Sequence, residues 1–198
     1  ADSASKTYDG TALTASGYTY TGSLAAGDTL VVTVGGSITD AGTGVSTVTS
    51  YKVMRGDVDV TSNYTFGASI DGTLTIDKRN VTLTSASGSK EYDASSLTNN
   101  SVAISGDGFV DGQGASFNVT GSQLDVGSSE NTFSYTLNDG TNADNYNITV
   151  ETGTLTVTPY AEVITITADS ASKTYDGTAL AASGYTYTGS LAAGDTLV

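Results

Sequence analysis

The chain has 198 residues and a formal net charge of −14, from 7 Lys and Arg against 21 Asp and Glu, and it contains neither cysteine nor histidine. The lack of cysteine and histidine excludes disulfides, the usual zinc sites and the common catalytic triads and thiol nucleophiles. The acidity argues against nucleic acid and anionic membrane surfaces as partners, because both require clustered positive charge. We therefore expect no enzyme, no cofactor and no metal site.

A five-residue signature occurs three times and divides the chain. Its tyrosines, Tyr8, Tyr92 and Tyr175, lie 84 and then 83 residues apart, a spacing typical of tandem small domains. The copies are Lys6-Thr7-Tyr8-Asp9-Gly10, Lys90-Glu91-Tyr92-Asp93-Ala94 and Lys173-Thr174-Tyr175-Asp176-Gly177. Residues 1–31 also recur at 168–198 with a single change, Thr14 to Ala181. This near-identity predicts further copies in a longer array.

We name the three parts repeat 1 (1–78), repeat 2 (79–160) and repeat 3 (161–198). Repeat 2 is predicted to be complete, repeat 1 to lack its first strand, and repeat 3 to be the front part of a module. Because an uncovered strand exposes unpaired amides and apolar side chains, we expect the strand at 163–167 to be completed by continuing chain or by a neighbouring copy. Neighbouring identical repeats are thus the expected partners.

Alternating apolar and polar residues predict the strands, taken in chain order. In repeat 1 they fall at 18–21, 30–34, 45–54, 64–66 and 73–76, and residues 23–28 are predicted to form one helical turn closed by Gly27. In repeat 2 they fall at 81–84, 102–104, 117–119, 132–137, 146–150 and 154–157. No helical apolar period longer than one turn is present, so the fold class is predicted to be all-β.

Further motifs recur in order along the repeats. Gly22 to Gly27 follows the first signature, Gly36-Ser37-x-x-Asp40-x-Gly42 returns at 121–127, and Asn63-Tyr64 with Gly72–Thr75 returns as Asn145-Tyr146 with Gly153–Thr156. This ordered set resembles the β-grasp-like tandem repeats, called YDG or MBG-type, of very large bacterial surface adhesins. The resemblance covers essentially the whole chain. It implies a β-grasp-like module of about 84 residues, secretion, anchoring at a cell surface and service as a stalk, and it carries no catalytic residues.

Each signature residue has two interpretations. The tyrosines are predicted to bury their rings at strand ends with their hydroxyls paired to backbone, although they could instead stack on a ligand. The lysines could form isopeptide bonds with an asparagine, but no spacing identifies one. Ala94 replaces the glycine of the other copies, which predicts a different turn there.

Two other patterns are candidate binding sites. Arg55-Gly56-Asp57 is a tripeptide that integrin-type receptors read, and it is predicted at an exposed hairpin tip, where it is a weak candidate recognition turn. Asp-rich turns at 57–59 and 139–144 carry the oxygens that calcium prefers, but their spacing does not match a calcium loop. We interpret them as solvated turns.

The leading functional hypothesis is a structural stalk that projects a distal adhesive region from a bacterial surface, as an extracellular rod of β modules. The alternative is a repeat that itself binds a host glycan or protein weakly and gains avidity from the array. Tyr18, Tyr20 and Tyr51 would supply its stacking platform. Their alternation with threonine equally predicts one buried strand face, which we favour.

Overall fold

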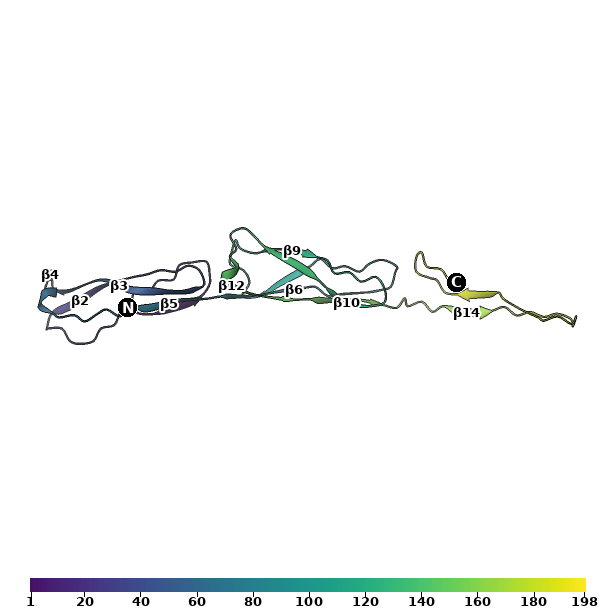
Figure 1. Ribbon diagram of the computed structural model, residues 1–198, viewed down its shortest axis with the longest axis horizontal. Helices are drawn as coiled ribbons and strands as arrows, with labels where there is room; N and C mark the ends of the chain where they lie inside the picture. Colours follow the sequence, from purple (N-terminus) through teal and green to yellow (C-terminus); the bar gives the residue numbers. More distant parts are fainter. The chain divides into compact units, whose positions relative to one another are not determined.

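The computed structural model describes all 198 residues, and the chain is almost entirely β structure (Figure 1). The all-β prediction is confirmed. The strands are β1 (Ala4–Thr7), β2 (Asp28–Gly35), β3 (Gly42–Arg55), β4 (Val58–Asp59), β5 (Gly72–Asp77), β6 (Arg79–Ser85), β7 (Gly88–Glu91), β8 (Val102–Gly106), β9 (Ala115–Val119), β10 (Gly127–Asn131), β11 (Phe133–Leu137), β12 (Tyr146–Glu151), β13 (Gly153–Thr158), β14 (Thr165–Ala168) and β15 (Tyr185–Thr188). Two single 3-10 turns, Thr61–Asn63 and Ala143–Asn145, are the only helical elements.

The chain forms two compact units, which do not follow the repeat boundaries. The first comprises Ala1–Leu83, Ile104–Ser116 and Tyr135–Val150. The second comprises Thr84–Ala103, Phe117–Ser134 and Glu151–Val198. The first unit therefore contains all of repeat 1 together with part of repeat 2.

One three-stranded arrangement occurs in both units. In the first unit, β5 is paired with β1 in parallel and with β3 antiparallel, in the order β1-β5-β3. In the second unit, β13 is paired with β7 in parallel and with β10 antiparallel, in the order β10-β13-β7. The central strands carry the core, because Leu74 and Ile76 of β5 and Leu155 and Val157 of β13 are buried. These side chains alternate with threonines, the pattern that predicted both strands.

The remaining strands build smaller sheets. β2 forms a long antiparallel hairpin with β3, interrupted by a bulge between Thr33 and Val34, and β4 adds to the far end of β3. β6 is the middle strand of the order β12-β6-β8, and its Val81 and Leu83 are buried. β11 pairs with β9, and β14 pairs with β15.

Two glycines explain the recurrent Gly-Thr-Leu-Thr motif. A Cβ at Gly72 would overlap the carbonyl oxygen of Asp2, and one at Gly153 would overlap the carbonyl oxygen of Ser85. The backbone of another segment therefore crosses directly over the first residue of β5 and of β13. At the second crossing the buried Ser85 hydroxyl accepts a hydrogen bond from the Gly153 amide, at 2.9 Å, and donates one to the Asn131 carbonyl.

Several predicted elements differ from the observed ones. Residues 18–21 and 64–66 are not strands, although the residues aligned with them in repeat 2 lie in β8 and β12. β1, β7 and β10 were not predicted, because they are short and rich in Ser, Lys and Glu. The predicted helical turn at 23–28 is instead a tight turn at Ala26–Gly27, closed by a hydrogen bond from the Asp28 amide to the Ala25 carbonyl, at 3.0 Å.

Replacing Gly153 with alanine should destabilise the protein by about 1–3 kcal/mol, because the new Cβ meets backbone atoms that cannot turn aside. Gly67→Ala is the matched control, since a Cβ at Gly67 meets nothing within 4 Å. Urea unfolding followed by circular dichroism measures both variants. Equal unfolding midpoints for the two variants would contradict the close crossing.

Candidate functional site

The signature forms the same turn in all three copies. In the first, the Lys6 ammonium donates hydrogen bonds to the Asp9 carboxylate, at 2.6 Å, and to the Thr11 carbonyl, at 2.8 Å. The same carboxylate oxygen of Asp9 accepts from the Thr11 amide, at 2.9 Å. The corresponding residues of the other copies are Lys90, Asp93 and Ser95, and Lys173, Asp176 and Thr178. We call this structure the signature turn.

The lysine lowers the pKa of each signature aspartate. A hydrogen bond from Lys6 holds the pKa of Asp9 far below its usual range, and bonds from Thr11 act in the same direction. Lys90 and then Ser95 lower the pKa of Asp93 from its ordinary 3.8 to about 2. The pKa of Asp176 is also lowered, first by Lys173. These lysines face aspartate, threonine and serine oxygens rather than the asparagine that an isopeptide bond with a lysine would require.

The prediction of a different turn at Ala94 is wrong. Gly10 and Gly177 have left-handed backbone angles, with φ of 79° and 77°, and Ala94 takes the same conformation with φ of 62°. It is the only non-glycine residue of the chain with positive φ. The hydrogen bonds from Lys90 and Ser95 to Asp93 hold the turn in place despite the Cβ of Ala94, which makes this conformation costly.

The first signature tyrosine is buried by residues of the following repeat. Tyr8 is 4% exposed, and its amide donates to the Asp77 carbonyl at the end of β5. Its hydroxyl accepts a hydrogen bond from the Gln113 side-chain amide, at 2.9 Å, and its ring meets that of Tyr146 edge-on, with centroids 5.6 Å apart. The predicted burial is confirmed for Tyr8, but the hydroxyl's partner is a side chain rather than backbone.

Repeat 2 prepares this contact through its own hydrogen bonds. The Tyr146 hydroxyl donates to the Gln113 side-chain oxygen and accepts from the Val110 amide, at 3.2 Å. The tight turn at 110–113, with Gly112 at φ of 79°, therefore fixes the Gln113 side chain. We call residues 110–113, and the equivalent turns at 25–28 and 192–195, the joint turns. Each has a glycine with positive φ as its third residue.

Two further contacts join repeats 1 and 2 within the first unit. The Arg79 guanidinium of repeat 2 donates to the Tyr8 carbonyl of repeat 1, at 3.5 Å, and is held within repeat 2 by the Gly108 and Asp107 carbonyls, at 2.7 and 2.5 Å. The buried Asn145 donates to the Asp40 carboxylate, at 2.8 Å, and accepts from the Ala41 amide, at 2.7 Å. We call the contacts of Tyr8, Arg79, Gln113, Asn145 and Tyr146 the joint. Gln113 and Arg79 had no sequence signal of their own, whereas Asn145-Tyr146 was visible as a recurrent motif.

The same components occur in the other repeats. In repeat 1 the Tyr64 hydroxyl donates to Asp28, at 2.5 Å, and this bond raises the pKa of Tyr64. In the second unit, burial first and then the Asp195 carboxylate of the joint turn of repeat 3 raise the pKa of Tyr92. Tyr92 is half-buried. Tyr175 contacts no joint turn and is 93% exposed, so the predicted burial is wrong for this copy.

The candidate recognition turn lies where it was predicted. Arg55 and Val58 are paired across a two-residue hairpin tip made of Gly56 and the exposed Asp57. The Arg55 guanidinium, however, makes two hydrogen bonds with the Asp28 carboxylate, at 2.7 and 3.0 Å, which lower the pKa of Asp28. The Arg55 side chain is thus held by the joint turn of repeat 1.

No group of three or more acidic side chains is gathered as for a metal ion.

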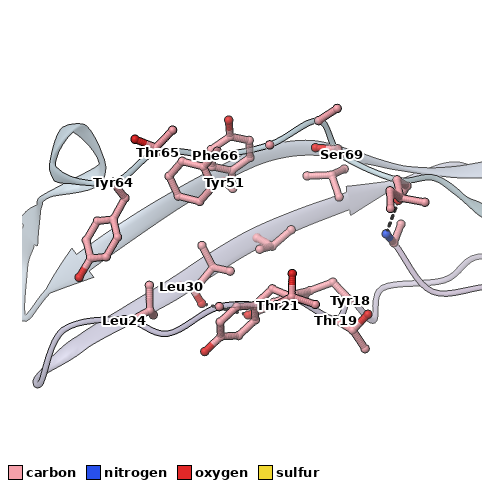
Figure 2. Close-up of a pocket in the computed structure, with 18 of the residues that line it drawn as sticks. Tyr18, Thr19, Thr21, Leu24, Leu30, Tyr51, Tyr64, Thr65, Phe66 and Ser69 are labelled. Atoms are coloured by element: carbon pink, nitrogen blue, oxygen red, sulfur yellow. Dashed lines mark hydrogen bonds between the residues drawn. The ribbon is translucent and has the colours of Figure 1, made fainter.

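Repeat 1 also contains an open groove of about 540 Å³ between residues 18–24 and 64–70 (Figure 2). Its floor is formed by the half-buried Leu30, Val32 and Val48. Rings of Tyr18, Tyr20, Tyr51, Tyr64 and Phe66 line its sides. Tyr20 is 54% and Tyr51 38% exposed, so the prediction that these tyrosines form one buried strand face is wrong for both.

No family model, curated protein or solved structure matches the chain. None of its helical turns has the length and apolar composition needed to cross a membrane.

The signature turns should make stability depend on pH in the acid range. The pKa of Asp93 is depressed in the folded state, so its stabilising effect is complete above pH 4 and is lost as the pH falls from about 4 to about 2. Urea unfolding midpoints should fall across this window. Lys90→Met should lower the midpoint at pH 7 and reduce the further loss in acid. Lys78→Met is the control, because Lys78 forms no ion pair. An identical acid loss in Lys90→Met would contradict this role.

Proposed function

We propose that the chain is part of a tandem array that serves as a stalk or spacer of a bacterial surface adhesin or extracellular fibre, and that the array projects a distal adhesive region. The observation that carries this proposal is the joint. A residue of the signature itself, Tyr8, is buried, and its hydroxyl and ring contact Gln113 and Tyr146 of the next repeat. A residue that identifies every repeat is thus used to connect repeats.

The joint has the properties that a spacer requires. It combines an edge-on aromatic contact, side-chain hydrogen bonds and the buried Asn145, so bending at this point would expose apolar rings and unpair buried polar groups. The connection between β5 and β6 is the single residue Lys78. Short connections of this kind restrict swinging. The effect of the Asp195 carboxylate on the pKa of Tyr92 supports a second connection, between repeats 2 and 3.

The recurrent three-stranded arrangement supports the interpretation as repeated β-grasp-like modules. In both copies a parallel pair, β1 with β5 or β7 with β13, is combined with an antiparallel neighbour. The resemblance to adhesin repeats supports an extracellular location at the cell surface. The acidic, cysteine-free composition agrees with an exported chain whose surface has little tendency to associate non-specifically.

The exposed tyrosines beside the groove of repeat 1 favour a second function, weak binding of a host glycan or protein. A comparison between repeats argues against this use of the groove. In repeat 2, the strands aligned with the two sides of the groove are β8 and β12, and strand β6 lies between them. The complete repeat thus has a strand where a ligand would bind, so we retain the spacer as the better-supported function.

The proposal predicts how length grows with the number of repeats. Small-angle X-ray scattering on chains with two, four and six complete repeats should give a maximum dimension that rises linearly, by about 30 Å per repeat, the size of a compact domain of this length. A maximum dimension that rises only slowly, as in a compact globule, would contradict a spacer. Growth as the square root of the number of repeats would indicate flexible joints and would contradict it as well.

A further inference from the structure

The chain contains six Asp-Gly pairs. Such a pair is prone to spontaneous isomerisation of the backbone, because glycine has no side chain to hinder approach to its amide nitrogen. We propose that Asp111-Gly112 and Asp139-Gly140 are sites of this modification, and that the signature lysines protect Asp9-Gly10 and Asp176-Gly177 from it. This inference goes beyond the spacer function and does not depend on it.

The reaction needs only the chain itself and water. The glycine amide nitrogen attacks the aspartate carboxyl carbon, a C–N bond forms as the carboxyl C–OH bond breaks, and the amide proton leaves with the hydroxyl as water. The resulting succinimide takes up one water at either carbonyl, which restores aspartate or leaves isoaspartate, with the chain running through Cγ. The carboxyl must be protonated, because an ionised carboxylate has no hydroxyl to lose, and its carbon must be free to approach the amide.

At Asp139-Gly140 nothing restrains the reacting groups. Both residues are exposed, and the Asp139 carboxylate takes part in none of the hydrogen bonds and ion pairs of the structure. The pair occupies the middle of a turn closed by a hydrogen bond from the Thr141 amide to the Asn138 carbonyl, at 3.0 Å, and the Gly140 amide donates no hydrogen bond. The carboxyl carbon is therefore free to approach that amide.

Asp111-Gly112 has the same setting in the joint turn of repeat 2. The pair is exposed, its carboxylate is likewise unbonded, and the turn is closed by a hydrogen bond from the Gln113 amide to the Val110 carbonyl, at 2.9 Å. Isoaspartate at this position lengthens the backbone of the turn by one methylene group. Since this turn fixes the Gln113 side chain, the modification would shift the partner of the Tyr8 hydroxyl.

The signature turn restrains its own aspartate in both respects. At Asp9-Gly10 one carboxylate oxygen accepts three hydrogen bonds, from the Lys6 ammonium at 2.6 Å and from the Thr11 hydroxyl and amide at 2.7 and 2.9 Å. These bonds direct the carboxylate to the Thr11 amide rather than to the Gly10 amide. The hydrogen bond from Lys6 also keeps the carboxylate ionised, since it holds the pKa of Asp9 far below its usual range.

The turn requires a glycine, which is the reason that protection is needed. Gly10 and Gly177 have φ of 79° and 77°, in the left-handed region that favours glycine. An aspartate followed by glycine is thus part of the signature itself. Lys173 and Thr178 hold Asp176 as their counterparts hold Asp9. The lysine that shapes the turn therefore also suppresses the reactivity that its glycine would otherwise confer.

The remaining two pairs are restrained in other ways. Asp71-Gly72 leads into β5, where the buried Gly72 is paired with Ser46 and crossed by the Asp2 carbonyl. The Asp107 carboxylate accepts a hydrogen bond from the Asn80 amide, at 3.1 Å. The Asp-Gly pairs thus divide into restrained and open ones, although the dipeptide is the same in all of them.

The first test follows the reaction at the two open pairs and the two signature pairs in one sample. Each passage through the succinimide introduces one solvent oxygen, so the chain is kept for several weeks at about pH 6 in water enriched in oxygen-18, digested with pepsin and mapped by tandem mass spectrometry. Labelling at Asp111 and Asp139 should exceed that at Asp9 and Asp176 at least about tenfold, because a carboxyl with a lowered pKa is less often protonated. Equal labelling at the four aspartates would overturn the proposal.

The same measurement in guanidinium chloride separates the fold from the local sequence. The four aspartates should become labelled at similar rates once the chain is unfolded, because the hydrogen bonds of the signature turn are then lost. A difference that persists in the unfolded chain would assign the protection to the neighbouring residues in the sequence and would also overturn the proposal.

The second test removes one signature lysine. Lys6→Met should raise labelling at Asp9 at least about tenfold and leave that at Asp176 unchanged, although the two aspartates lie in identical stretches, residues 2–13 and 169–180. Lys173→Met should have the reverse effect. Asp71 should stay unlabelled in Lys6→Met, because its protection depends on the sheet around β5 and not on the lysine. Unchanged labelling at Asp9, or labelling at Asp71 as strong as at Asp9, would overturn the protective role of the lysine.

Discussion

The connection of repeats 1 and 2 depends on one contact. The buried ring of Tyr8 packs against the ring of Tyr146, and the Gln113 side chain is hydrogen-bonded to both tyrosine hydroxyls. A buried tyrosine needs a partner for its hydroxyl, and Gln113 supplies one because a side-chain amide can donate to Tyr8 and accept from Tyr146 at once. Asp28 and Asp195 occupy the same place in the other joint turns. A carboxylate only accepts hydrogen bonds, so a tyrosine hydroxyl bonded to either aspartate must be the donor, as Tyr64 is to Asp28.

The rest of each repeat holds this contact in place. The signature turn fixes the end of β1 or β7 through a lysine that bonds both the carboxylate and the backbone of the same loop. The parallel pairing of β1 with β5 then sets where Tyr8 leaves the sheet. The close crossing at Gly72 allows the N-terminal segment to reach that pairing. The signature and the Gly-Thr-Leu-Thr motif are therefore parts of one structural device, although about 65 residues separate them.

Sequence patterns predicted the strands whose apolar pattern can be recognised within a short stretch of sequence. β5 and β13 alternate apolar and polar residues because one face of each is buried, and β2 alternates half-buried with exposed residues, so the pattern is visible in a short window. β1 and β7 were missed because they are short, polar and held by parallel pairing to residues about 70 positions away. Residues 18–21 show the opposite case, since their alternation is real but a strand forms only where a neighbour of the β6 type is present. Gln113 was not predicted because its role depends on Tyr8, 105 residues away.

The central claim is that the joint fixes repeat 1 against the part of repeat 2 in the same compact unit, and one measurement tests it directly. The chain has no cysteine, so spin labels can be attached at Ser50→Cys and Thr136→Cys, both exposed positions of that unit. Pulsed electron paramagnetic resonance should give one narrow distance distribution for this pair. Tyr8→Ala should broaden it, whereas Tyr175→Ala, at the exposed signature tyrosine, should not. A broad distribution in the chain with Tyr8 intact, or an unchanged one in Tyr8→Ala, would contradict the account.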